Sequence, residues 1–322
     1  MGGCIVIRIS LACAFLAYAS AGFGGEDVQS VGHGLPSYAP STREAEDALS
    51  RVENSTQRDP QTAVMLSIVA DRYRAQHALA TAEKLYRRAL VMFEETMGAQ
   101  HPNVATVAQK LAQFYRTQNS YSLADTYYRR ALDIFERTLG PDHANVSAVL
   151  VEMAMLYRAH NSYKELERVN LRTIAISERT LGMDHPSTIA LLNDLSSFYQ
   201  ARGRFADAEA LARRSLQSAE RTLGPDHPTV AALLNDLAGT CQLQGRMAEA
   251  ERLYKRSISI LEKSLGPDHP ALEVSLNGLI VLYQSQGRKE EAERAIRRVA
   301  EVANTRYRGQ WTGPMIVHQR TR

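Results

Sequence analysis

Apolar residues recur along this chain at the spacing of helical faces. Leu234, Leu237, Ala238 and Cys241 stand at i, i+3, i+4 and i+7, so they share one side of a helix. A short polar break at residues 244–246 follows, after which the same spacing resumes. The pattern predicts a first helix of about 15 residues and a second of about 18, joined by a tight turn.

The helix pair repeats every 42 residues, and a six-residue block marks each period. The block reads Leu-Gly-Pro-Asp-His-Pro from Leu223 and from Leu265, with near copies from Met97, Leu139 and Leu181. Self-similarity of this length marks an array whose units bury their apolar faces by stacking on their neighbours. We therefore predict an all-α array of about six helix-turn-helix units over residues 59–304.

The residues of the block are helix stop and start signals. Its glycine suits the C-terminal cap of the second helix, and the proline that follows forbids further helix. Its Asp or His can cap the next helix, and its last proline suits the first turn of that helix. Within the units, the tight turn falls on residue types that tolerate a left-handed conformation, namely Asn119, Asn161, Gly203, Gly245 and Gly287.

Small and aromatic residues also repeat at fixed places in both helices, where they permit close helix packing. In the first unit these places hold Leu66, Val69, Ala70, Tyr73, Ala82, Tyr86 and Ala89. The pattern resembles the tetratricopeptide repeat family, and a period of 42 residues instead of about 34 is similar to its kinesin-light-chain-type subgroup. The resemblance implies a right-handed superhelical solenoid in which the first helix of each unit lines a concave groove, and a function in binding other proteins.

Two units depart from this pattern. In the third unit Leu166 and Asn170 occupy the small and aromatic positions, so we expect a local change of packing there. In the fifth unit Cys241 replaces the tyrosine of the first helix, and we interpret it as a buried, inert apolar residue.

The N-terminal segment carries the signs of an export signal. Arg8 precedes an apolar stretch from Ile9 to Ala19, and the small residues up to Ala21 suit cleavage. We predict a signal peptide over residues 1–21 and an exported protein, periplasmic or secreted. An uncleaved membrane anchor over residues 5–23 is the alternative.

Further segments flank the array. Residues 22–40 are rich in Gly, Pro and Ser and predict a flexible linker. The capping-box pattern from Ser41 to Glu44 predicts a capping helix within residues 41–58. Residues 305–322 form a basic C-terminal tail.

Composition and charge patterning exclude several classes of function. The net charge of +3 is small. The basic residues of the second helices each follow an acid by four residues, as Arg87, Arg129, Arg213, Lys255 and Arg297 show. Such pairs favour a solvated face over a nucleic-acid surface. No catalytic, metal-binding or phosphate-binding motif is present, so we predict no enzyme, cofactor, metal or small-molecule substrate.

The candidate binding residues lie one residue after the first apolar position of each first helix, and again seven residues later. The first row contains Ser67, Gln109, Val151, Asn193, Asn235 and Asn277. The second row contains Arg74, Arg116, Arg158, Gln200, Gln242 and Gln284. The resemblance places both rows in the groove, where a carboxamide can donate to and accept from an extended peptide. The arginines would favour acidic groups near the N-terminal half.

The predicted function is therefore an interaction scaffold that binds a peptide or partner protein. The alternatives are a structural self-assembly module and an accessory subunit of an envelope or export complex.

Overall fold

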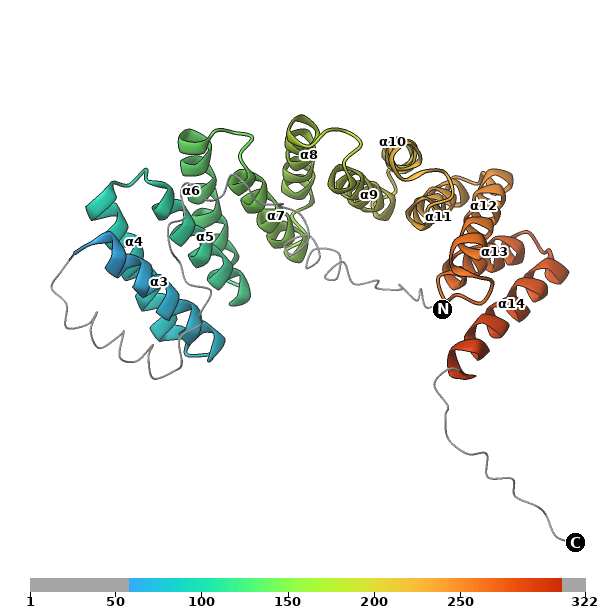
Figure 1. The fold of residues 1–322 in the computed structure, drawn as a ribbon, viewed down its shortest axis with the longest axis horizontal. Helices are drawn as coiled ribbons and strands as arrows, with labels where there is room; N and C mark the ends of the chain where they lie inside the picture. The colour runs from blue at the N-terminus through green and yellow to red at the C-terminus, as the bar shows by residue number, and fades with distance from the viewer. Residues whose placement is uncertain (1–57, 309–322) are drawn as a thin grey trace, which may run out of the picture. The chain divides into compact units, whose positions relative to one another are not determined.

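A computed structural model describes residues 58–308, which form helices and no strand (Figure 1). The odd-numbered helices are α3 (Pro60–Ala75), α5 (Pro102–Thr117), α7 (Ala144–Ala159), α9 (Pro186–Ala201), α11 (Pro228–Leu243) and α13 (Leu272–Ser285). The even-numbered helices are α4 (Leu79–Met97), α6 (Tyr121–Leu139), α8 (Tyr163–Thr180), α10 (Phe205–Leu223), α12 (Met247–Leu265) and α14 (Lys289–Arg308). The all-α fold of six helix pairs is confirmed.

Several predicted segments lie outside the described residues. They are the signal segment 1–21, the linker 22–40, almost all of the capping region 41–58, and the tail after residue 308. Within residues 58–308, none of the helices combines the length and the apolar character that crossing a membrane requires.

The helices pack in chain order, each against the next (Figure 1). Contacts that skip a helix join odd-numbered neighbours, as in α5 with α7, α9 with α11, and α11 with α13. No comparable contact joins two even-numbered helices of the described residues. The odd-numbered helices are therefore the more closely spaced, and we call the face that they form the inner face.

The predicted small and aromatic positions form the core between the helices. The alanines of the even-numbered helices are fully buried in four units, as Ala82 and Ala250 illustrate. Tyr86 and Tyr128 pack beside them with no exposed surface, and Cys241 is equally buried. The small residues allow the helices to approach closely, and the aromatic rings fill the remaining space. A unit without its neighbours could not bury these side chains.

In four of the five blocks the glycine caps the end of the preceding even-numbered helix, as predicted. Gly224 has φ 88° and ψ 156°, and Gly140 has φ 94° and ψ 156°. This is an extended backbone with positive φ, which only glycine adopts readily. The turns inside the units are different, because Asn119 and Asn161 are accommodated there at φ 56°. His77 holds the same turn in the first unit at φ 62°.

The histidine of the block caps the next helix. Nδ1 of His227 accepts a hydrogen bond of 3.1 Å from the backbone N–H of Thr229, and His143 does the same for Asn145. His101 and His185 repeat the contact, while Asp59 caps α3 through its carboxylate. The periodic histidines are thus satisfied as helix caps.

The third unit departs from its neighbours at the end of α8. The helix stops at Thr180, one residue before the leucine of the block, and the backbone N–H of Gly182 donates to the carbonyl of Ser177. The hydroxyl of Ser177 also bonds the buried hydroxyl of Thr188 at 2.7 Å. Leu166, in the small position of α8, is fully buried, whereas Asn170 is half-buried.

Candidate functional site

The asparagine and glutamine row of the odd-numbered helices is unevenly exposed. Asn277 is exposed and Asn193 is half-buried, but Asn235 keeps only 9 % of its surface. The Asn193 side-chain amide donates to Oδ2 of Asp236 at 2.9 Å, and Nε2 of Gln109 donates to Oε1 of Glu152 at 3.0 Å. Ser67 is buried and Val151 half-buried. Much of the hydrogen-bonding capacity of this row is therefore used between repeats.

The second predicted row is also unevenly exposed, and some of its side chains already have partners within the array. Arg158 and Gln284 are exposed, while Arg74 lies 3.5 Å from a carboxylate oxygen of Asp71. Gln242 accepts a hydrogen bond of 3.2 Å from the Tyr254 hydroxyl. Gln200 and Arg116 are half-buried. Gln200 extends across to α11, where its Nε2 would lie 3.4 Å from a Cβ at Gly239.

Acidic residues that the sequence analysis did not single out lie among these rows. Asp71 accepts hydrogen bonds of 2.5 Å from Lys110 and from the Tyr86 hydroxyl. Burial raises the pKa of Asp194 to about 6; the nearby Arg158 opposes the shift and Asp236 adds to it. Burial also raises the pKa of Asp236, against the opposing hydrogen bond from Asn193. For Asp194 and Asp236 the sequence signal was their position directly after the predicted asparagines Asn193 and Asn235.

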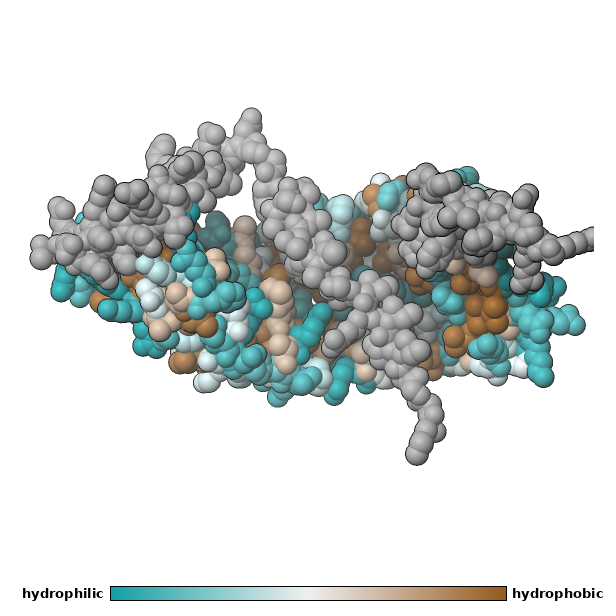
Figure 2. Space-filling view, turned by 90° about the horizontal axis from the view of Figure 1, so that it is seen from below, coloured by the Kyte–Doolittle hydropathy of each residue, from teal (hydrophilic) through white to brown (hydrophobic). Residues whose placement is uncertain are grey.

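Charge is divided unequally between the odd-numbered helices. Helices α3, α5 and α7 contain the cations Arg72, Arg74, Lys110, Arg116 and Arg158 and the acids Asp71 and Glu152. Helices α9, α11 and α13 contain the acids Asp194, Asp236 and Glu273 and no Lys or Arg. The odd-numbered helices thus carry a positive excess in units one to three and a negative excess in units four to six. Viewed from below, the molecule shows hydrophilic and hydrophobic residues interspersed along the described residues (Figure 2).

The acids of the even-numbered helices also join neighbouring repeats. The hydroxyl of Tyr115 donates to Glu83 at 2.7 Å, and that of Tyr157 donates to Asp125 at 2.6 Å. Equivalent bonds join Tyr199 to Glu167 and Tyr283 to Glu251. The predicted pairs with bases four residues later are confirmed, as in Arg129 with Asp125 at 2.7 Å. Except for Glu167, which has no base four residues later, each of these acids therefore stabilises both its own helix and the junction with the next repeat.

Arginines near the start of the later even-numbered helices strengthen these junctions. Arg288 donates to Glu251 and stacks over the Tyr283 ring, with 4.4 Å between the guanidinium carbon and the ring centroid. The hydrogen bond from Arg288 is the main cause that lowers the pKa of Glu251 to about 2. Arg246 has the same effect on the pKa of Glu209.

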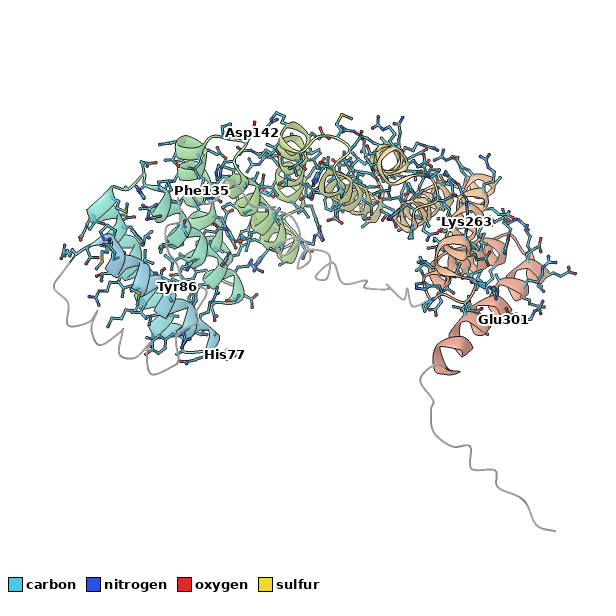
Figure 3. All side chains as sticks on the ribbon, viewed as in Figure 1. His77, Tyr86, Phe135, Asp142, Lys263 and Glu301 are labelled. Atoms are coloured by element: carbon cyan, nitrogen blue, oxygen red, sulfur yellow. The ribbon has the colours of Figure 1, made fainter. Side chains whose placement is uncertain are left out.

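The aspartate of the block forms a further link between repeats. Asp142 lies 2.5 Å from Arg179 of α8, and Asp184 lies 2.5 Å from Arg221 of α10. Asp226 pairs in the same way with Lys263, which is labelled with Asp142 in Figure 3. These pairs involve residues of the block and of the following even-numbered helix, so they lie away from the inner face.

One pocket of about 440 Å³ lies between α12, α13 and α14. Its lining combines Leu276, Leu279 and Ala295 with the charged Lys255 and Arg294. None of the predicted binding residues lines it. The candidate site is therefore the extended inner face rather than this pocket.

A family model described as tetratricopeptide repeat matches residues 61–137, 110–179, 187–263 and 229–305. The chain belongs to the tetratricopeptide repeat family. Its fold is that of a protein-interaction scaffold built from stacked helix pairs. No curated protein matches the chain in a sequence search.

Solved structures support the same assignment. Tetratricopeptide-like repeats assigned to a kinesin light chain of Podospora anserina share 27 % identity at a TM-score of 0.54, covering 65 % of this chain and 99 % of that one. BtubC (BKLC) from P. vanneervenii has 19 % identity and a TM-score of 0.52, over 70 % of this chain and 91 % of that one. The C-terminal part of a repeat protein from Cytophaga hutchinsonii has 13 % identity and a TM-score of 0.58, over 82 % and 90 %. The last two show the fold alone, and the first confirms the kinesin-light-chain-type resemblance.

Proposed function

We propose that this tetratricopeptide repeat protein is an exported scaffold whose inner face binds an extended segment of a partner protein. One observation carries the proposal: polar and charged side chains recur at one-repeat spacing along the odd-numbered helices, which are the more closely spaced helices of the array. Such a row offers hydrogen bonds at regular intervals to an extended chain. The proposal assigns binding to the protein and no catalytic step.

Site-directed photocrosslinking of the full chain tests the proposal. A photoreactive phenylalanine analogue would replace exposed residues of the odd-numbered helices, namely Arg158 or Asn277. Matched control positions are Asp133 of α6 and Glu290 of α14, which are exposed on even-numbered helices. We expect the same partner to be crosslinked in the native host from Arg158 and Asn277 and not from the controls. Equal crosslinking from both sets would overturn the inner face as the binding surface.

Export is the second part of the proposal, and it rests on the apolar segment from Ile9 to Ala19 and the small residues after it. Residues 1–40 fused to a reporter that is active only after export should give activity. Deleting residues 5–21 from the fusion should abolish that activity. The mass of the exported product distinguishes a cleaved signal from an anchor over residues 5–23. Reporter activity without these residues would contradict export through this segment.

A further inference from the structure

Two half-buried carboxylates lie on the inner face without an ion-pair partner. Asp194 of α9 and Asp236 of α11 are one repeat apart, and burial raises the pKa of both carboxyl groups. Among residues 58–308 neither forms a salt bridge within 4.0 Å, and Arg158 of α7 acts on Asp194 only at longer range. Buried carboxylates are ordinarily paired with a cation, since the charge is costly to remove from water.

Two carboxamide oxygens without a hydrogen-bond partner lie on the same two helices as these carboxylates. Asn193 uses its Nδ2 on Asp236, and its buried Oδ1 has no hydrogen-bond partner among the described residues. Because the two atoms belong to one carboxamide, this free oxygen lies beside the Asp236 carboxylate. Asn235 is more than nine-tenths buried, and its Oδ1 also lacks a partner.

The repeat geometry explains why the Asn235 amide lacks the acid partner that Asn193 has. Gln109 and Asn193 each reach the acid that stands 43 residues further along the chain, Glu152 and Asp236 respectively. The same step from Asn235 leads to Gly278, which has no side chain to bond. The ring of Tyr254 occupies the space beside Gly278, at 2.4 Å from where a Cβ would stand. The Asn235 amide therefore has no acid to donate to at this position, and its Oδ1, like that of Asn193, has no hydrogen-bond partner among the described residues.

The chemistry of these groups defines what they would bind. Two carboxylates and two carboxamide oxygens are all acceptors, and the helices that carry them supply no Lys or Arg. An ammonium group brings three donors and no acceptor, and a guanidinium brings five donors. Charge-assisted hydrogen bonds from such a group would satisfy the acceptors and neutralise the carboxylates together.

We propose that Asp194, Asp236 and the adjoining Asn193 and Asn235 receive a lysine or arginine side chain of the bound partner segment. This inference rests on the proposed function and adds to it the direction in which the bound segment runs along the inner face. The segment lies with its basic residue on units four and five and with acidic residues toward the exposed Arg158 and the units before it. Charge complementarity of this kind sets orientation and selects partners.

Peptide selection on the full chain tests this inference. A random library of 12-residue peptides displayed on phage would be selected on the wild-type chain, on Asp194→Asn/Asp236→Asn, and on the control Asp133→Asn/Glu290→Gln. The control removes the same number of charges from exposed positions on even-numbered helices. We expect wild type and control to select peptides that contain Lys or Arg, and the Asp194/Asp236 variant to lose that preference.

Affinity measurements on one selected peptide complete the test. Fluorescence anisotropy should show a loss of about tenfold or more on Asp194→Asn/Asp236→Asn, as for a buried charge pair that loses one partner. Replacing the peptide's basic residue by Gln should weaken wild-type binding similarly, and should change binding to the variant little. Thermal melts check folding, and the single variant Asp194→Asn supports the same comparison if the double variant does not fold.

Three outcomes would overturn the inference. The first is an unchanged Lys and Arg preference in the double variant. The second is competition by free spermidine as strong as that of the peptide, which would assign the acids to a polyamine. The third is selection of peptides without basic residues, which would leave the proposed function standing. Selection of no peptide by the wild-type chain would instead overturn the proposed function, and this inference with it.

Discussion

At the scale of single residues, the carboxylates differ in what surrounds them. Burial disfavours the charged form of some, and neighbouring donors stabilise the charged form of others. Asp194 has a pKa raised to about 6, whereas Glu251 has a pKa lowered to about 2. The difference arises because Glu251 accepts hydrogen bonds from Arg288, Lys255 and the Tyr283 hydroxyl, while Asp194 has only the charge of Arg158 in its favour, without a salt bridge. The charged form of Asp194 therefore lowers the stability of the folded protein, and the charged form of Glu251 raises it.

Replacing Asp194 by Asn should stabilise the folded chain at pH 8. The folded pKa of about 6 lies above the unfolded value near 3.8, so the folded state binds protons more tightly. The destabilisation caused by the Asp194 carboxylate is absent below about pH 3.8. It grows between the unfolded and the folded pKa, and it is fully present above about pH 6. The full shift corresponds to about 3 kcal/mol.

Urea unfolding of both proteins at pH 8 and pH 4.5 measures this difference. The advantage of Asp194→Asn should shrink strongly at pH 4.5, and Asp133→Asn, at an exposed position, provides the control. A variant that is less stable than the wild type at pH 8 would show that the carboxylate has a partner in the folded protein.

At the scale of helices, the later repeats use two kinds of glycine at helix ends, one between repeats and one inside the repeat. Gly224, between repeats, has φ 88° and ψ 156°, a backbone region that only glycine enters readily. Gly245, inside a repeat, has φ 77°, and two other repeats place an asparagine at the equivalent turn. No side chain or backbone atom would obstruct a Cβ at either position. Backbone conformation alone therefore distinguishes them.

The same substitution at both glycines should have unequal effects. Gly224→Asn should cost about 1–3 kcal/mol, since asparagine must enter a region that excludes a Cβ. Gly245→Asn should cost well under about 1 kcal/mol, because asparagine tolerates the left-handed region. Chemical denaturation of the two variants provides the comparison, and each serves as the control for the other. Equal losses would contradict this account of the turns.

At the scale of the whole array, each helix is stabilised by its neighbours in sequence. Helix α11 packs against described helices on both sides, namely α9, α10, α12 and α13, whereas α14 has described neighbours on one side only: it packs mainly on α13 and forms an ion pair with Glu262 of α12. The bonds between Tyr and acid, and between the block aspartates and the next repeat, join adjacent units in the same way. Stability in such an array is the sum of unit terms and of terms between nearest neighbours.

Hydrogen exchange should therefore be slowest in the middle of the array. We expect amides of α11 to exchange at least about tenfold more slowly than amides of α14, because α14 can open by breaking a single interface. Hydrogen–deuterium exchange with mass spectrometry on the full chain measures both helices together. Uniform protection from α3 to α14 would show that the array opens as one cooperative unit instead.

The sequence by itself determined the architecture. The 42-residue period, the Gly and Pro of the block and the apolar spacing depend on local backbone preference and on burial, so they predict helix pairs, their turns and their stacking. They also restricted the cap of the next helix to the Asp or His of the block, and His227 makes that bond, which spans only two residues.

Only the tertiary structure decided which polar groups of the inner face are already used. Asn193, Asn235 and Asn277 occupy one position of the repeat, yet one bonds Asp236, one is buried without a partner and one is exposed. The difference between Asn193 and Asn235 depends on the residue that stands 43 positions further on, across the interface between repeats, which is Asp236 for the first and Gly278 for the second. A helical period identifies the face on which a side chain lies, but its partner is set by how neighbouring helices pack.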